Sequence, residues 1–333
     1  MMEPALFAVA DRLARQAGLG AARSGQQLTG GANNRVFRID TAGGPALLKA
    51  YFRSERDPRN RYGAELSFLQ FARHCGIDCV AQPLAHDEAA GVLLQEWLPG
   101  RRPEAAAIDF AAVQQAVDFL TRLNEQRDTA MAGQLPAASE ACFRVVDHVR
   151  TVDRRVGRLT ELAGQTSVDL AAKAFVSDEL LPTWQRLAAS IPQDECEAPL
   201  PPVDRCLSPS DFGFHNVLMD DAGRCRFVDF EYAGWDDPAK TVIDFFSQPT
   251  LGVSQEHLPY FLERIGSYIG APEALHGRVK MLWPVYRVKW CCIVLNIFHA
   301  VDAGPRRFAG ADADALRGQH LERARALWRT LTD

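Results

Sequence analysis

The sequence predicts an α+β fold, because strand-like segments gather in its first third and helical patterns fill the rest. From residue 26 to residue 97, short apolar runs are bounded by Gly, Asn or Pro, as strands are. After Gly100, apolar residues instead recur at the three- and four-residue spacing of amphipathic helices. A sheet followed by helices, without regular alternation of the two, is typical of the α+β class.

The amino-terminal part is predicted to contain two helices and a small antiparallel sheet. Residues 1–18 have apolar positions at helical spacing and acidic residues where a secretion signal would be basic, so an amphipathic helix is expected. A second helix is expected over 58–74, with Asp57 as its N-cap and Gly76 beyond its end. The predicted strands span 26–30, 35–40, 45–52 and 91–98.

The carboxy-terminal part is predicted to be helical around one short hairpin. Strands over 217–219 and 225–230 would be joined by the turn DDAG at 220–223, which would bring Asn216 close to Asp229. A proline-rich segment near 191–202 has the character of a linker. The predicted helices span 109–124, 140–162, 168–190 and much of 238–333.

Composition narrows the class of protein. The 333 residues are 47% hydrophobic, enough for a sizeable core and about two domains. A net charge of −5 argues against a nucleic-acid partner. The eight cysteines form no C-x-x-C pair and are expected to be reduced core residues. The longest strongly apolar run, 290–298, is shorter than the roughly 20 residues of a membrane span, so a soluble cytoplasmic protein without a membrane partner is expected.

Three residues have the chemistry of a phosphoryl-transfer site. Asp211 precedes Asn216 by five positions, and Asp229 follows an apolar strand. A hydroxyl acceptor needs a carboxylate to orient it and take its proton, and Asp211 fits that need. The Mg²⁺ ions that neutralise phosphates need hard oxygen ligands, which an amide and a carboxylate provide.

These residues also carry a family resemblance. D-x-x-x-x-N at 211–216, followed by FVDFEYAGWDDP at 227–238, resembles the catalytic segment of the aminoglycoside phosphotransferase and choline kinase families, small-molecule relatives of the protein kinases. The resemblance implies a two-lobed protein-kinase-like fold, with a nucleotide-binding N-terminal lobe over 1–98, a mainly helical C-terminal lobe over 99–333, and the active site between them.

The resemblance also implies roles for individual residues. Asp211 would be the catalytic base, Asn216 and Asp229 the Mg²⁺ ligands, and Asp244 a buried carboxylate that braces the catalytic loop through backbone hydrogen bonds. Glu231 stands where choline kinases carry a glutamate.

One departure concerns the loop before the base. The family usually has His two residues before the catalytic aspartate, where this chain has Pro209. Either neighbouring serine, Ser208 or Ser210, could supply a hydroxyl hydrogen bond to the same backbone, and the sequence leaves the choice open. His215 is interpreted as a loop histidine without acid or base function.

A glycine- and asparagine-rich loop at 29–36 is the candidate phosphate cradle. Its residues tolerate positive φ and allow backbone N–H groups to approach a phosphate, although a plain hairpin turn is the alternative. The loop resembles the G-G-x-x-N loop of aminoglycoside phosphotransferases, which implies nucleotide contacts from Gly30, Gly31, Asn33 and Asn34.

The remaining nucleotide contacts are expected from a lysine, a glutamate and a hinge. Lys49 lies in an apolar strand, and Glu65 lies in the next helix at the position that the resemblance implies for its partner. The alternatives are a lysine at a strand edge in water and a solvated helix glutamate. The hinge, whose backbone would read the adenine of ATP, comprises Gln95, Glu96, Trp97 and Leu98.

The acceptor side is less specific. Trp283, Tyr286 and Trp290 share one helical face, either as core or as a wall for a sugar ring or a quaternary ammonium group. Just past the candidate metal ligand, Glu231, Asp236 and Asp237 could line a mouth that favours a cationic acceptor, with a solvated acidic turn as the alternative. Glu231, Tyr232 and Trp235 are further candidate substrate residues.

The sequence therefore predicts a Mg²⁺-dependent kinase that transfers the γ-phosphoryl group of ATP to a hydroxyl of a small molecule. A sugar or aminoglycoside, choline or ethanolamine, and an amino alcohol such as homoserine remain open as acceptors. The alternative, motivated by Pro209, is a nucleotide-binding pseudokinase that serves as a scaffold. The sequence does not predict an oligomeric state.

Overall fold

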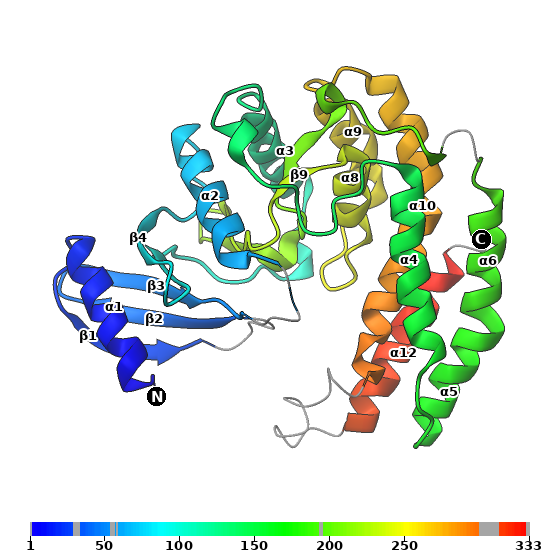
Figure 1. Ribbon diagram of the computed structural model, residues 1–333, viewed down its shortest axis with the longest axis horizontal. Helices are drawn as coiled ribbons and strands as arrows, with labels where there is room; N and C mark the ends of the chain where they lie inside the picture. The colour runs from blue at the N-terminus through cyan, green and yellow to red at the C-terminus, as the bar shows by residue number, and fades with distance from the viewer. Residues whose placement is uncertain are drawn as a thin grey trace. The chain divides into compact units, whose positions relative to one another are not determined.

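The computed structural model describes residues 2–28, 34–53, 57, 59–192, 196–299 and 313–330 (Figure 1). The chain forms two compact units, and neither is one continuous stretch. Unit 1 comprises Met1–Ala141 and Cys206–Asp236, and unit 2 comprises Cys142–Arg205 and Asp237–Asp333. The lobe boundary near residue 98 stays a prediction.

Unit 1 contains a five-stranded sheet in the order β1-β2-β3-β5-β4, with every neighbouring pair antiparallel. The sheet contains the strands predicted over 35–40, 45–52 and 91–98, with shifted ends, and one additional strand, β4, that the sequence did not reveal. The strand predicted over 26–30 lies mostly earlier, as β1, and its residues 29–30 fall outside the described residues. Its strands are β1 (Ala22–Gln27), β2 (Arg35–Thr41), β3 (Gly44–Ala50), β4 (Pro83–Asp87) and β5 (Val92–Glu96).

The predicted amino-terminal helix is α1 (Pro4–Gln16), and its apolar face packs on the sheet (Figure 1). Leu6 and Leu13 of this helix belong to one buried cluster with Ile39 of β2 and Leu48 of β3. Because side chains alternate along a strand, the residue after Leu48 points to the opposite face of the sheet. The packing of α1 therefore leaves that opposite face for Lys49.

The second helix begins later than predicted. Helix α2 spans Arg61–His74, and its N-cap is Asn60, whose side chain accepts a hydrogen bond from the Gly63 amide. Asp57 does not cap it, because its carboxylate instead pairs with Arg59 and Arg61. The predicted first residue, Pro58, lies outside the described residues. The end at His74 is confirmed.

The rest of unit 1 consists of one long helix and two small strand pairs. Helix α3 (Phe110–Asn124) begins one residue after its predicted start, and Asp109 is its N-cap. Strands β7 (Val217–Met219) and β8 (Cys225–Phe227) form the predicted hairpin, although β8 ends three residues earlier than expected. Strand β6 (Cys206–Ser208) pairs with β9 (Gly234–Asp236).

Unit 2 is helical in its described residues. The predicted helix over 140–162 is α4 (Val145–Thr160), and the one over 168–190 is a continuous run in which a π-helical turn, Val176–Leu180, joins α5 (Ser167–Phe175) to α6 (Leu181–Ser190). Every residue of α8 is buried. The remaining helices are α8 (Pro238–Ser247), α9 (Leu258–Gly266), α10 (Pro272–Leu295) and α12 (Ala313–Arg329).

One described helix, Pro272–Phe298, is long and apolar enough to cross a membrane by length and composition alone. It is longer than the apolar run noticed in the sequence because polar residues interrupt its apolar positions. Of its most apolar window, 72% is buried inside the protein, as in the core helix of a soluble protein.

The prediction for the cysteines is confirmed in part. All eight are free thiols, and five of them, Cys142, Cys206, Cys225, Cys291 and Cys292, are buried. Cys75, Cys79 and Cys196 are only partly buried and do not belong to the core.

Candidate active site

Lys49 of β3 bonds two carboxylates that come from different segments of unit 1. Its Nζ donates to Oε2 of Glu65 on α2 at 2.6 Å and to Oδ1 of Asp229 at 2.5 Å. Lys49 is 5% exposed and Glu65 is 1% exposed, which excludes a lysine and a glutamate in water. The structure thus joins three predicted site residues that lie up to 180 positions apart in the sequence.

The charge state of this group follows from its surroundings. Burial alone would lower the pKa of the Lys49 ammonium, but Glu65, Asp229 and Glu231 outweigh that effect and raise the pKa above its ordinary value. Burial raises the pKa of the Glu65 carboxyl, and Lys49 opposes that rise. Because the Gln95 amide also donates to Glu65, at 3.2 Å, we interpret Lys49 and Glu65 as a buried ion pair.

Asp229 has an unusual backbone conformation. Its φ is +71°, in the left-handed region that residues other than glycine rarely adopt. Such conformations persist where the surrounding structure holds them, and they gather at functional sites. The adjacent Val228 amide donates to the Asn216 carbonyl at 3.0 Å, which extends the β7–β8 hairpin by one step. The predicted approach of Asn216 to the segment carrying Asp229 is therefore confirmed at the level of the backbone.

The loop that carries Asp211 is tightly turned. Ser210 has a φ of +67°, and the Asp211 amide donates to the Pro209 carbonyl at 2.9 Å, which closes a γ-turn. Both serines contribute to the loop that Pro209 interrupts. The Ser208 hydroxyl accepts from the Ser210 amide at 3.0 Å, and the Ser210 hydroxyl donates to the Ser139 carbonyl at 3.2 Å.

The Asp211 carboxylate receives contacts from two later residues of the same loop. Nδ2 of Asn216 lies 3.0 Å from the Asp211 carbonyl oxygen and 3.4 Å from Oδ2. Nε2 of His215 lies 3.2 Å from Oδ1. The sequence interpretation of His215 as a loop residue overlooked this contact, although its four-residue separation from Asp211 could have indicated it.

Asn216 and Asp229 suit the ligation of Mg²⁺. Because Nδ2 of Asn216 is directed to Asp211, the amide oxygen is left for a cation. Asp229 accepts from Lys49 through one carboxylate oxygen, and its side chain is 43% exposed. Both supply the hard oxygen ligands that Mg²⁺ prefers. The described residues contain no group of three His, Cys, Asp or Glu side chains that could hold a metal, so oxygens of phosphate or water would complete the coordination.

Glu231 is part of the same charged group. It is 4% exposed, accepts a hydrogen bond from the Asn34 side chain, and lies 3.7 Å from Nε of Arg61. Burial is the largest of the effects that raise the pKa of the neighbouring Tyr232 to about 12. The sequence analysis missed Arg61, although it stands one helical turn before Glu65 on the same face of α2.

The other predicted nucleotide-binding residues belong to the glycine-rich loop and to the hinge. Gly30, Gly31 and Asn33 lie outside the described residues. Of the hinge residues, Gln95 is 5% exposed and contacts Glu65, whereas the Glu96 amide donates to the Gln82 carbonyl within the sheet. Trp97 lies under the guanidinium of Arg38, and Leu98 is buried.

The predicted acceptor residues have partners in the protein interior. Trp235 donates from its indole nitrogen to the Ala132 carbonyl at 3.0 Å. In unit 2, Tyr286 and Trp290 are 3% and 7% exposed, and their polar atoms bond His148 and Asp244. This burial favours the core alternative for those two aromatic residues. Trp283, which is half-buried, lies 5.5 Å from the Arg287 guanidinium and stays a candidate.

Asp244 has its described side-chain partners within unit 2. Its carboxylate accepts from Nζ of Lys289 at 2.9 Å and from the indole of Trp290 at 3.0 Å. These two side chains are both carried by α10, so Asp244 joins α8 to α10. The expected bracing of the catalytic loop, which belongs to unit 1, stays a prediction.

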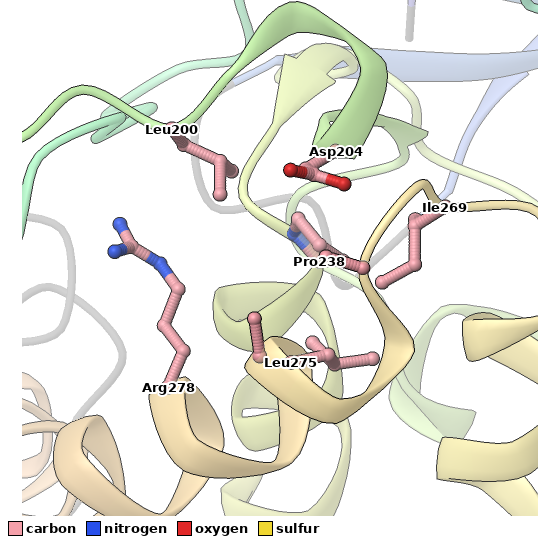
Figure 2. Close-up of a pocket in the computed structure, with 8 residues that line it drawn as sticks. Leu200, Asp204, Pro238, Ile269, Leu275 and Arg278 are labelled. Atoms are coloured by element: carbon pink, nitrogen blue, oxygen red, sulfur yellow. The ribbon is translucent and has the colours of Figure 1, made fainter.

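Unit 2 also contains a small cavity, shown in Figure 2. Leu200, Ile269 and Leu275 give it apolar walls, and Asp204 and Arg278 lie on different sides of it. Its volume of about 30 Å³ is room for little more than one or two water molecules. A sugar or an amino alcohol would not fit.

Comparison with known proteins shows the family of this chain. Residues 24–257 match the model of the phosphotransferase enzyme family. A comparison with curated proteins finds no match.

Solved structures with the same fold include three kinases. A choline/ethanolamine kinase family protein from Mesorhizobium loti is 19% identical, with 97% of this chain and 96% of that chain covered and a TM-score of 0.57. A spectinomycin phosphotransferase, solved with ADP and spectinomycin, is 14% identical, with 98% of each chain covered and a TM-score of 0.63. An ethanolamine kinase from Plasmodium vivax is 11% identical, with 92% and 83% covered and a TM-score of 0.57.

At these low sequence identities the structural similarities show the fold alone. They confirm the α+β, protein-kinase-like fold, with an antiparallel sheet in the amino-terminal part and a mainly helical remainder. The family match confirms the resemblance found in the catalytic segment.

Proposed function

Because this chain belongs to the phosphotransferase enzyme family, we propose that it transfers the γ-phosphoryl group of ATP, with Mg²⁺, to a hydroxyl of a small acceptor. The observation that carries the proposal is the position of Lys49, whose single ammonium group bonds both Glu65 and Asp229. A lysine held between a helix carboxylate and a metal-binding carboxylate is the arrangement that phosphoryl transfer requires.

Lys49 would bind phosphate oxygens of the nucleotide. Its raised pKa keeps the ammonium charged at neutral pH, so it offers a full positive charge to the triphosphate. Glu65 fixes the direction of the lysine side chain. The Asp229 carboxylate then has an exposed part that can bind a cation while its Oδ1 stays with Lys49.

Mg²⁺, when bound by Asn216 and Asp229, would neutralise charge on the phosphates. Asp211 would orient the acceptor hydroxyl and take its proton, because its carboxylate is 42% exposed beside Asn216. Positioning and charge neutralisation provide most of the acceleration in such sites. No residue of this chain needs to form a covalent bond to the phosphoryl group.

The adenine would be read by the backbone after β5. Since the Glu96 amide is committed to the Gln82 carbonyl, the amide that donates to the base would come from Trp97 or Leu98. Because these contacts come from the main chain, the side chains do not indicate a preference for ATP over GTP, and a binding measurement with both nucleotides decides it.

The proposed acceptor is a sugar, aminoglycoside or amino alcohol. Tyr232, Trp235 and Trp283 remain candidate contacts, because each is only partly buried. Glu231 is a weaker candidate, since it is buried against Asn34 and Arg61. A soluble, cytoplasmic enzyme without nucleic-acid or membrane partners remains part of the proposal.

The test is ATP consumption with Mg²⁺ against a panel of sugars, spectinomycin, gentamicin, choline, ethanolamine and homoserine. Asp211→Ala should lower turnover by about 10²–10⁴-fold, because a general base contributes on that order. Nucleotide affinity, measured by calorimetry, should stay within about threefold.

The control is Asp221→Asn, a change at a side chain that is 96% exposed in the β7–β8 turn. It should leave turnover unchanged. Turnover that survives in Asp211→Ala would overturn the assignment of the base, and nucleotide binding without turnover on any acceptor would favour a pseudokinase.

A further inference from the structure

His215 stands beside the proposed base in a loop that buried aromatic side chains hold. Phe212 and Phe214, on either side of Gly213, are 3% and 1% exposed. Phe212 packs against Phe227 of β8, with ring centroids 5.6 Å apart. Because these rings anchor the loop, His215 is held in place by its neighbours, with its side chain only 16% exposed.

The two ring nitrogens of His215 have different surroundings. Nε2 lies 3.2 Å from Oδ1 of Asp211, whereas Nδ1 is buried without a hydrogen-bond partner among the described residues. An ionised carboxylate only accepts hydrogen bonds, so Nε2 must carry the proton in this contact. The partners therefore assign Nε2 as the donor to Asp211.

Both oxygens of the Asp211 carboxylate receive contacts from its own loop. His215 approaches Oδ1, and Asn216 approaches Oδ2 from 3.4 Å, which is a longer and weaker contact. A carboxylate held mainly at one oxygen cannot rotate freely. The second oxygen stays accessible, because the Asp211 side chain is 42% exposed.

We propose that His215 is a positioning residue for Asp211, which donates from Nε2 to Oδ1 and thereby fixes the rotation of the carboxylate. This role rests on the proposed function of Asp211 as the base. Resembling chains carry a histidine at the position of Pro209, before the aspartate. In this chain Ser208 and Ser210 hold the backbone of the loop, and His215, after the aspartate, holds the aspartate side chain.

The kinetic test compares two replacements at one position. Gln places an amide N–H donor where Nε2 stands, and Leu removes the donor while it keeps the volume. We expect His215→Leu to lower kcat by about 10–100-fold, as a small misplacement of a reacting group does. The KM for ATP should stay within about twofold, and His215→Gln should recover most of the lost kcat.

The matched control is His276→Leu, which removes an exposed histidine of α10. It should leave kcat and the melting temperature unchanged. Equal kcat values for the Gln and Leu variants, or a loss that appears in the KM for ATP and not in kcat, would overturn the proposal. Melting temperatures of all variants identify a loss that is due only to unfolding.

A second measurement does not depend on turnover. Nitrogen-15 spectra of the histidine-labelled protein, with His215→Gln as the assignment reference, report which ring nitrogen of His215 carries the proton. We expect a proton on Nε2, and a shift of the Nε2 signal in Asp211→Ala. An Nε2 atom without a proton, or a signal indifferent to Asp211→Ala, would overturn the contact even if no acceptor is found. The proposed function and the positioning role can thus fail separately.

Discussion

Carboxylates in the two units differ in how far their partners bury them. In unit 2, Asp237 accepts from Arg278, His148 and a backbone amide, and Asp244 accepts from Lys289 and Trp290, with Lys240 at 3.8 Å. In unit 1, one lysine, Lys49, bonds both Glu65 and Asp229, and the Asp229 side chain stays 43% exposed. The carboxylates of unit 2 are enclosed by donors of the protein, whereas Asp229 in unit 1 has an exposed part that suits a bound cation. This difference separates a structural polar core from a binding site.

The largest expected effect is on the stability of unit 2. Asp244→Asn would leave Lys289 and Lys240, which are 7% and 2% exposed, without their carboxylate. Removing one partner of a buried ion pair costs about 3–5 kcal/mol, so the free energy of unfolding should fall by that amount. Urea denaturation followed by circular dichroism measures it.

The matched control in unit 2 is Glu263→Gln, at an exposed position of α9. It should change the free energy of unfolding by less than about 0.5 kcal/mol. If Asp244→Asn is no more destabilising than Glu263→Gln, the polar core of unit 2 contributes nothing and the comparison between the units fails.

The next effect should appear in activity without a comparable loss of stability. Asp229→Asn removes a proposed metal ligand, and turnover should fall by about 10²–10³-fold, as for loss of a group that stabilises developing charge. Asn tolerates the observed φ of +71° as well as Asp does, and Lys49 keeps its buried partner Glu65. The free energy of unfolding should therefore change by less than about 1 kcal/mol. A much larger loss of stability would show that the unit 1 cluster is structural too.

The smallest expected effect is a dependence of stability on pH. Burial would raise the pKa of Asp237, but the hydrogen bond from His148 and the charge of Arg278 outweigh burial and lower it. A carboxyl with a lowered folded pKa contributes stability above its unfolded pKa of about 3.9, and loses it as the pH falls through the folded value. The free energy of unfolding should decrease below about pH 4, and less steeply in Asp237→Asn. Identical slopes in the two proteins would contradict this origin.

Sequence patterns predicted the elements whose causes are local. The hairpin with its DDAG turn, and the end of α2 before Gly76, were found because neighbouring residues determine them. The start of α2 was misjudged because arginines draw Asp57 away from a capping role. Strand β4, with the sequence PLAHD, was missed because it lacks the β-branched residues that mark strands.

In the candidate site, too, some residues were predicted from the sequence and others were missed. Lys49, Glu65 and Asp229 were predicted from their order and from the family motif. Arg61 was missed because its partner Glu231 lies 170 positions later, where no local pattern connects them. The partners of Asp244 were missed for the same reason, since they stand 45 and 46 positions away on α10.

In the hairpin β7–β8, the distance between the proposed metal ligands does not depend on the length of the turn. Asn216 and Asp229 stand at the strand ends away from the turn, where the Val228 amide donates to the Asn216 carbonyl. The turn at 220–223 is at the other end, with Asp221 almost fully exposed. Evolution can therefore lengthen or rewrite that turn, for instance to add a contact surface, while the ladder keeps the ligands in register. A tag or a short insertion placed there should be tolerated for the same reason.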